Sequence, residues 1–496
     1  MLSVVFPFFI IAYFLFLFIV SWLSGRKADN DSYFLGNKKS PWILVSIGML
    51  SDSLSGVTFI SVPGWVGTTL FSYLQIVMGY LVGYFVIARV LLPLYYKLNL
   101  VSIYSYLNQR FGKHTQKTGS AFFLISRVVG AAFRLYLTAS VLQLFIFDKW
   151  HVPFALSVIC IIILILLYTF KGGIKTLVYT DAIQSGFLVL GVILSIATIS
   201  SQLHLGFFDI IHTVQVSPYS KVFFWDWHEK TFFVKEFFSG MFIAIVMTGL
   251  DQNMMQKNLS CRTLKSSQKN MYWFSVVYAI VNVFFLSMGV LLYTYANIQH
   301  ITLPVNAAGK PLTDHLFPML ALNYLGDFAA IAFIVGLTAA TFASADCVLT
   351  TLTTSFCVDI LGMKTDGEKH EGKVLLTRHI VHISFAILLL AVILVFRVLN
   401  NDAVINGIFT AAGYTYGPLL GLFAFGLFTH NKINDSLSPW ICIISPIICF
   451  FLNLYSQQLF DGYIFGYELL IVNGFITFLG LLLISRRELK TQLTNG

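Results

Sequence analysis

Runs of about twenty apolar residues recur from one end of this sequence to the other, and they limit the possible folds more than any other feature. A run of that length lets a helix cross the hydrocarbon core of a membrane. Because 57% of the residues are hydrophobic and only 11% are charged, the composition is far from that of a soluble domain. Backbone groups in lipid must be hydrogen-bonded internally, so we predict an all-α polytopic membrane protein.

Hydropathy places about thirteen transmembrane helices along the chain. Their approximate limits are residues 4–23, 41–68, 71–96, 118–147, 153–170, 176–203, 234–256, 271–296, 326–356, 374–399, 403–429, 437–456 and 465–485. The aromatic-rich segment FFWDWHEKTFF, between the sixth and seventh spans, is typical of a membrane interface.

The distribution of lysine and arginine predicts the orientation of these spans. If the N-terminus is outside, the inside segments hold 22 of these residues and the outside segments hold 5. Cytoplasmic loops are enriched in basic residues, so we expect the N-terminus outside and the C-terminus in the cytoplasm, in a bacterial-type cytoplasmic (inner) membrane. Topology, rather than nucleic-acid binding, then explains the net charge of +9.

The sequence lacks the residues that several classes of protein require. The sequence contains no GxxxxGK[ST] loop for a triphosphate, no CxxC pair and no spaced set of histidines for catalysis. No polar segment longer than about thirty residues interrupts the spans, which argues against a kinase or an appended sensor domain. We therefore expect no enzyme activity and no cofactor, and any uphill transport would draw on an ion gradient.

Polar residues interrupt the second predicted span at SDSLSG, residues 51–56. Ser, Asp and Gly compete poorly for helix, so we expect a discontinuous helix here. A broken helix frees backbone carbonyls that suit a hard cation such as Na⁺, and Asp52 adds a carboxylate at membrane depth. The alternative is a packed kink, with Asp52 hydrogen-bonded only to its neighbours, although a kink requires no carboxylate.

A second polar stretch lies in the predicted span 326–356. Four small residues follow the i, i+3, i+4, i+7 spacing of one helix face: Ala340, Ala343, Ser344 and Cys347. A narrow face of small residues allows close helix packing, which competes with a functional interpretation. Packing does not require the neighbouring Asp346, and this acid favours a functional role.

Three further charged residues lie within apolar sequence. Asp181 is near the inner end of the span 176–203, where a functional and an interfacial role are both open. Arg127 and Arg134 are seven residues apart, so both lie on one face of the span 118–147. Two guanidinium groups in a membrane helix need partners, which are either acids of the same bundle or an anionic substrate.

Five stretches together resemble the sodium:solute symporter family, the group of sodium/glucose, sodium/proline and sodium/sialic acid transporters. They are SDSLSGVTF, YTFKGGIKTLVYTDAIQSG, GLDQNMMQKNLSCRT, AATFASADCVLTTLTTSFCVDI and GPLLGLFAFGLF, in family order over most of the chain. The resemblance implies a leucine-transporter-type fold with a 5+5 inverted repeat and a discontinuous first core helix. We accordingly expect a single membrane transport domain over 1–496, with an extra N-terminal helix at 4–23, repeats at 41–256 and 271–456, and a C-terminal helix at 465–485.

The resemblance also implies a sodium site between the first and eighth core helices. The matching positions are Ser51 and Leu54, through their carbonyls, and Ala340, Ala343 and Ser344. Many members have two adjacent hydroxyls where this chain has Ala343 and Ser344, so Asp52 is a candidate for the missing oxygen, as in the proline-transporter branch.

Some sialic acid transporters have a second sodium site beside the acid that Asp181 matches, completed by serines of the eighth helix. Here Asp346 and Cys347 stand at the positions of those serines. Two facing carboxylates either bind a cation or share a proton, so a second cation site and a proton site at Asp181, Asp346 and Cys347 are both open.

The substrate residues implied by the resemblance are Ser53, Ser55, Thr58, Gln75, Arg127 and Arg134. Sialic acid transporters use hydroxyls of the first core helix and one arginine of the third core helix, and either Arg127 or Arg134 can be the match. We therefore predict a monomeric Na⁺-coupled symporter that imports a small polar organic solute, favouring a sugar acid or other carboxylate. The alternatives are a proton-coupled symporter or a neutral sugar or amino-acid symporter of the same fold, and, more remotely, a membrane-embedded enzyme or a solute sensor.

Overall fold

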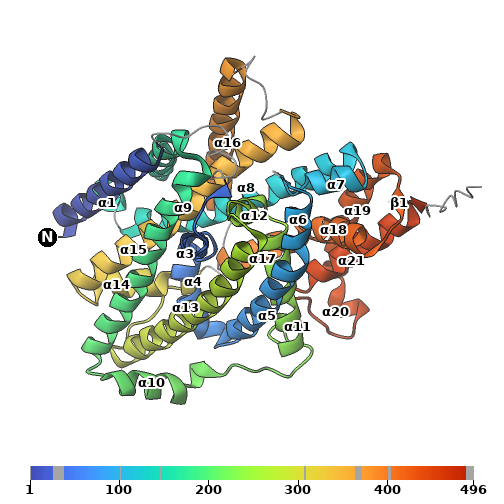
Figure 1. The fold of residues 1–496 in the computed structure, drawn as a ribbon. Coiled ribbons are helices and arrows are strands. Elements are labelled where there is room, and N and C mark those ends of the chain that lie inside the picture. The colour runs from blue at the N-terminus through green and yellow to red at the C-terminus, as the bar shows by residue number, and fades with distance from the viewer. Residues whose placement is uncertain are drawn as a thin grey trace, which may run out of the picture.

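The computed structural model describes residues 2–25, 38–100, 102–145, 147–306, 309–363, 371–399 and 404–486. Within these ranges, the description leaves out the side chains of residues 2–11, 24–25, 145, 168–175, 346, 371–373 and 399. The described chain is a bundle of helices, most of which run side by side (Figure 1).

The first half of the bundle contains the helices α1 (Leu2–Gly25), α3 (Trp42–Ser53), α4 (Gly56–Thr69), α5 (Tyr73–Val86), η2 (Ile87–Leu91), α6 (Leu92–Lys97), α7 (Ser105–Arg110), α8 (Lys113–Phe145), η3 (Phe147–Trp150), α9 (Phe154–Gln202), α10 (Phe207–Val216), η4 (Pro218–Ser220), α11 (Phe233–Ala244) and η5 (Ile245–Gly249). The second half contains α12 (Gln252–Leu259), α13 (Leu264–Ile298), η6 (Thr313–His315), α14 (Leu316–Asn323), α15 (Asp327–Ser355), η7 (Phe356–Ile360), α16 (Glu371–Leu399), α17 (Val404–Thr415), α18 (Gly417–Phe428), η9 (Asp435–Leu437), α19 (Ser438–Leu454), α20 (Ser456–Leu459), α21 (Leu469–Leu483) and the two short strands β1 (Lys432–Ile433) and β2 (Ser485–Arg486).

The apolar helices coincide with the predicted spans. Among the described residues, seven helices are long and apolar enough to cross a membrane, and three bent helix pairs raise the number to ten. The remaining predicted spans hold shorter apolar helices, at Ala12–Leu23, Phe154–Leu167 and Leu469–Leu483. Helical structure is thus present at all thirteen predicted positions, while the number of membrane crossings stays a prediction.

One predicted boundary differs from the structure. The sequence predicts a short basic loop at residues 171–175 between two spans, whereas the backbone there lies within α9, which is helical from Phe154 to Gln202. The stretch KGGIK contains no proline, so no residue is sterically barred from the helical hydrogen bonds. Two glycines weaken a helix by only about 1 kcal/mol each, a cost that the packing of α9 against α3 and α15 can offset.

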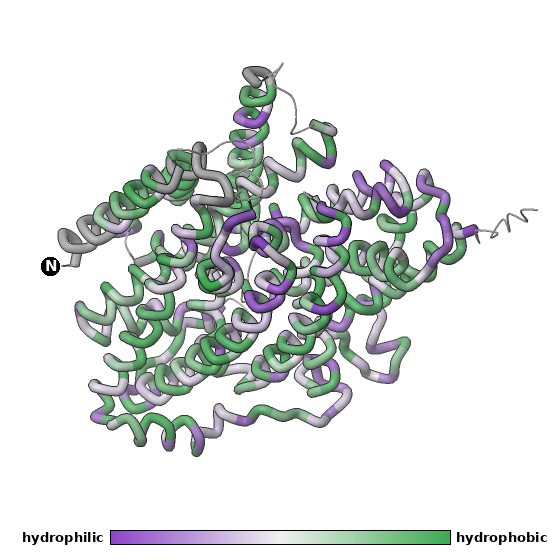
Figure 2. The backbone as a smooth tube through the Cα atoms, viewed as in Figure 1, coloured by the Kyte–Doolittle hydropathy of each residue, from purple (hydrophilic) through white to green (hydrophobic). Residues whose placement is uncertain are grey.

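Loops that share a predicted side of the membrane meet in the structure. On the predicted inner side, Arg110 Nη2 donates to the carbonyl of Thr429 at 2.8 Å, and β1 pairs antiparallel with β2. On the predicted outer side, the Phe71 N–H donates to the carbonyl of Lys221 at 3.1 Å. Figure 2 shows hydrophilic residues gathered around α12 and beside α7 and β1.

The first bent pair, α3 and α4, lies inside the bundle. α3 packs against α9, α12, α13 and α15, and α4 packs against α8, α13, α15 and α17. Most side chains of both segments are buried, including every residue from Gly56 to Val66. The break between them is therefore enclosed by protein, the surroundings that irregular backbone at membrane depth requires.

Candidate functional site

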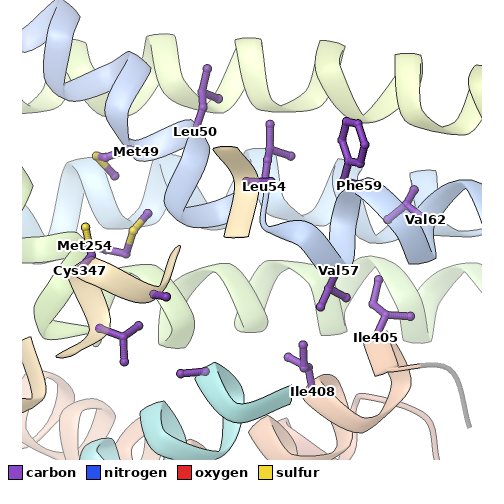
Figure 3. Close-up of a cluster of buried hydrophobic side chains, with 14 of the residues drawn as sticks. Met49, Leu50, Leu54, Val57, Phe59, Val62, Met254, Cys347, Ile405 and Ile408 are labelled. Carbon is purple, nitrogen blue, oxygen red and sulfur yellow. The ribbon is translucent and has the colours of Figure 1, made fainter. Parts of the chain in front are cut away.

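The first core helix is broken, as predicted. α3 ends at Ser53 and α4 begins at Gly56, with a bend of 59° between the two segments. Figure 3 shows Leu54 at the turn and Val57 just beyond it. A Cβ at Gly56 would lie only 2.7 Å from Thr138 Oγ1 and 2.8 Å from Thr341 Oγ1, so the start of α4 needs a glycine to approach α8 and α15 this closely.

The break leaves backbone carbonyls without helical partners. At the second break, between η5 and α12, two tyrosine hydroxyls donate at 2.8 Å each to the carbonyls of Gly249 and Leu250. At the first break, no backbone N–H of a described residue donates to the carbonyl of Ser51 or Leu54. The two carbonyls predicted to bind sodium therefore lack a backbone hydrogen bond among the described residues.

The predicted eighth-helix ligands lie on α15, which packs against α3 and α4. Ala340, Ala343 and Ser344 are all buried there. The Ser344 hydroxyl donates to the carbonyl of Thr341 at 3.0 Å. Because that hydrogen bond uses the proton, the lone pairs of the Ser344 oxygen stay available to a cation.

A buried cluster of opposite charges lies beside the break. Lys257 Nζ donates to Asp181 Oδ2 at 2.5 Å and also to Asp52 Oδ2. Cys347 Sγ donates to Asp181 Oδ2 at 3.3 Å. The three charged side chains are at most 1% exposed, and the second oxygen of each carboxylate has no hydrogen-bond partner. Burial of such charges is costly unless they are paired, and Lys257 supplies the pairing.

Hydroxyl groups fix the carboxylate-bearing helices α3 and α9 against each other. Ser185 Oγ donates to the Ile47 carbonyl at 2.6 Å and accepts the Ser51 N–H at 3.0 Å, so the hydroxyl is inserted into the hydrogen-bond ladder of α3. Ser51 Oγ in turn donates to the carbonyl of Asp181 at 3.2 Å. The last turn of α3, which carries Asp52, is therefore joined directly to α9.

Arg127 is paired with Asp251, a residue that the sequence did not single out. Arg127 Nε lies 2.8 Å from Asp251 Oδ2, and Nη2 donates to Oδ1 at 3.1 Å. The same carboxylate accepts the Tyr416 hydroxyl at 3.0 Å and the Met254 N–H at 3.2 Å. Asp251 thus caps α12 and joins it to α8 and to the start of α18.

Next to the break is a central cavity of about 80 Å³, room for several water molecules. Its polar lining includes Asp52, Ser53, Ser55, Thr58, Arg127, Arg134 and Thr248, and its other walls are Tyr73, Tyr80, Tyr84, Tyr278, Val57, Ile243, Ala244, Met247, Met254, Ile405, Ile408 and Phe409. Figure 3 shows Val57, Ile405 and Ile408 on this side of α4. The cavity is therefore lined by hydroxyls and guanidinium groups together with aromatic and aliphatic side chains.

Arg134 differs from Arg127 in its partners. Arg134 Nη1 donates to the backbone carbonyl of Asp52 at 3.4 Å, and its Nε has no hydrogen-bond partner. No described carboxylate forms an ion pair with Arg134. Of the two arginines on α8, only Arg134 thus presents to the cavity a guanidinium that forms no ion pair with a described carboxylate.

A family model described as the sodium:solute symporter family matches residues 33–444 of this sequence. The chain belongs to the sodium:solute symporter family. The symporter is therefore a sodium-coupled transporter of a small organic solute and not an enzyme.

Two curated relatives and one solved structure are similar to the symporter. A sodium/sialic acid symporter of Aliivibrio fischeri is 25% identical over 86% of this chain and 83% of its own length. One from Proteus mirabilis is 26% identical over 92% of this chain and 91% of its own. The structure of a Na⁺-coupled sialic acid symporter, in a substrate-bound outward-open state with a novel Na⁺ site, aligns with a TM-score of 0.79 at 20% identity over 96% of this chain and 98% of that one. This likeness shows the leucine-transporter-type fold.

Two predicted site residues remain. Gln75 lies away from the central cavity, and the side chain of Asp346 is not among the described residues. Gln75 does not line the central cavity, because its amide nitrogen donates to Glu236 Oε2 at 2.5 Å and to the carbonyl of Thr231 at 2.9 Å. Glu236 lines a separate cavity of about 560 Å³. The side chain of Asp346 lies outside the described residues, so its facing Asp181 stays a prediction.

Sequence reasoning missed two charged residues of the site. It counted Lys257 among the basic residues of an inside loop, but Lys257 is fully buried on α12, which leaves 21 such residues against 5 and the same predicted orientation. It assigned no role to Asp251. Both residues lie in the stretch GLDQNMMQKNLSCRT. Two charged residues within a motif that resembles the family were the sequence feature that could have indicated their role.

Proposed function

We propose that this symporter carries a small carboxylate, such as a sugar acid, together with Na⁺. The observation that carries the proposal is the guanidinium of Arg134, which lines the central cavity while Arg127 is bound by Asp251. A buried arginine needs a counter-charge, and a carboxylate can accept two parallel hydrogen bonds from its fork. The sialic acid of the two curated relatives is a solute of this class.

The remaining cavity walls suit the other parts of such a solute. The hydroxyls of Ser53, Ser55 and Thr58 are the partners that sugar hydroxyls need, and the tyrosines of the same cavity supply flat apolar surface. A volume of about 80 Å³ is below the 300 Å³ at which ligand pockets usually begin. We therefore propose that the cavity widens when a sugar acid binds.

We further propose that the coupling Na⁺ binds between α3 and α15. The support is the carbonyls of Ser51 and Leu54, which lack a backbone hydrogen bond, and the packing of α3 against α15, the helix that carries Ala340, Ala343 and Ser344. Carbonyls at a helix break and a hydroxyl oxygen are ligands that hard cations use. Asp52 is a weaker candidate for this site, since one of its oxygens is already bound by Lys257.

Replacing Ser344 with Ala is expected to raise the Na⁺ concentration for half-maximal uptake about tenfold, because loss of one ligand costs about 1.4 kcal/mol. Initial uptake rates in proteoliposomes, measured over a series of Na⁺ concentrations, provide the test. Ser384→Ala is the matched control, since Ser384 is exposed and its hydroxyl makes the analogous bond to Ile380. An unchanged Na⁺ dependence in Ser344→Ala would remove Ser344 from the site.

The proposed function is tested by thermal stability of the purified full chain. We expect a sugar acid such as sialic acid or glucuronate, or a smaller carboxylate such as lactate, to raise the unfolding temperature in Na⁺ but not in K⁺. A ligand at 100 times its Kd adds about 2.7 kcal/mol. Stabilisation only by neutral sugars or amino acids would contradict a carboxylate substrate. Equal stabilisation in Na⁺ and K⁺ at one pH would instead favour the proton-coupled alternative.

We also propose that the symporter is a monomer in a bacterial-type inner membrane, with its N-terminus outside and its C-terminus in the cytoplasm. The asymmetry of 21 to 5 basic residues supports this orientation. A fluorescent protein fused after Gly496 is expected to mature in the cytoplasm, and a periplasmic phosphatase fused there is expected to be inactive. An active phosphatase at Gly496 would reverse the proposed orientation.

A further inference from the structure

Two acids and one lysine form a cluster beside the break. The atoms that pair within it are Asp52 Oδ2, Asp181 Oδ2 and Lys257 Nζ, and the proposed solute site uses none of these three. Asp52 comes from α3, Asp181 from α9 and Lys257 from α12, and Cys347 of α15 completes the cluster. An oxygen of each acid and the Cys347 sulfur all lie within 4.8 Å of one another, a spacing at which one cation can contact all three. The ammonium of Lys257 is within bonding distance of both carboxylates.

We propose that the Lys257 ammonium is a tethered cation that fills this position in place of a second Na⁺, so that the symporter couples one Na⁺ to each solute. The inference rests on the proposed function, because it sets the ion count of the same transport reaction. The Nζ atom lies 2.5 Å from Asp181 Oδ2, a distance at which hard cations bind carboxylate oxygens. An ammonium and a Na⁺ cannot occupy the same position between the two acids.

Burial and hydrogen bonds fix helix α12, which carries Lys257. Every residue of α12 is buried, and the carbonyl of Lys257 itself accepts the Ser260 hydroxyl at 2.7 Å. The neighbouring Asn258 accepts the Asn270 amide at 2.8 Å and donates to the Met254 carbonyl at 3.0 Å. Because α12 is fixed at both of its ends, the ammonium is available at a constant position, unlike a Na⁺ ion that must be recruited from solution.

The charges of the described side chains support the coupling of one Na⁺ to each solute. Among the described side chains of the site, the three carboxylates of Asp52, Asp181 and Asp251 are matched in number by the three cations Lys257, Arg127 and Arg134, so their formal charges sum to zero. One carboxylate solute and one Na⁺ preserve this neutrality together, whereas either ion alone adds a net charge at low dielectric. Joint binding is therefore favoured, which is the thermodynamic requirement for symport.

Removing the tethered charge is expected to create a Na⁺ site. In Lys257→Met the side chain keeps its length and loses its charge, so Asp52 and Asp181 are left facing each other with no cation between them. We expect the native chain to bind one radioactive Na⁺ at saturation and Lys257→Met to bind two. Lys257→Arg, which retains the charge, and Lys265→Met, at an exposed position of α13, are both expected to bind one.

A second variant locates the new site and guards against loss of folding. In the double variant Lys257→Met, Asp181→Asn, one buried acid remains, and binding is expected to return to one Na⁺. Equilibrium binding to purified full-length protein measures all of these variants without transport. Two Na⁺ bound by the native chain would overturn the inference, as would a folded Lys257→Met that binds one. Native protein that binds no Na⁺ would instead contradict the proposed function, and this inference with it.

Discussion

Arg134→Gln is expected to weaken carboxylate binding by roughly 100-fold. The substitution removes the guanidinium that faces the central cavity without a described acid as partner. Hydrogen bonds to charged groups contribute about 3 kcal/mol at most, which corresponds to roughly 100-fold in affinity. The loss is expected in the apparent KM of uptake and in ligand-induced thermal stabilisation, while the Na⁺ affinity without solute changes little.

Two further variants make the Arg134 result specific. Arg134→Lys keeps the charge but not the planar fork, so we expect partial loss, of about tenfold. Arg397→Gln removes an arginine from an exposed position of α16, where its guanidinium stacks 4.1 Å from the ring centre of Phe154, and is the matched control. Equal carboxylate affinity in Arg134→Gln and Arg397→Gln would exclude Arg134 as the solute ligand.

Asp251→Ala is expected to lower the free energy of unfolding by about 3–5 kcal/mol. This is the usual effect of breaking a buried ion pair, because Arg127 is left with its charge buried and unpaired. The substitution also removes the acceptor for the Tyr416 hydroxyl and the cap of α12. Chemical denaturation of the purified chain, followed by its intrinsic fluorescence, measures the change.

The contribution of charge can be separated from that of the cap. Asp251→Asn preserves an oxygen for the Met254 N–H but leaves Arg127 without its counter-charge, so most of the destabilisation should persist. Adding Arg127→Gln to it removes the unpaired charge and should restore much of the lost stability. If the double variant is no more stable than Asp251→Asn, the pairing of Arg127 is not what Asp251 contributes.

The amino-acid sequence by itself determined where the helices run and where the first core helix breaks. Lipid accepts only backbone whose hydrogen bonds are made internally, so an apolar run of sufficient length has few alternatives to a helix. The stretch from Ser51 to Gly56 departs from that pattern in the sequence itself, and the 59° bend lies there. Both features depend on residues that are close together in the sequence, so they can be predicted without the tertiary structure.

The tertiary structure alone decided which charges are neighbours. The seven-residue spacing of Arg127 and Arg134 makes them equivalent on α8, yet only one of them meets Asp251, 124 residues away in the chain. The sequence predicts that Lys257 lies in a loop, but its ammonium pairs with Asp52, 205 residues away in the chain, and with Asp181, 76 residues away. Such pairs depend on how helices cross, and helix crossing is set by the packing of whole surfaces rather than by any local pattern.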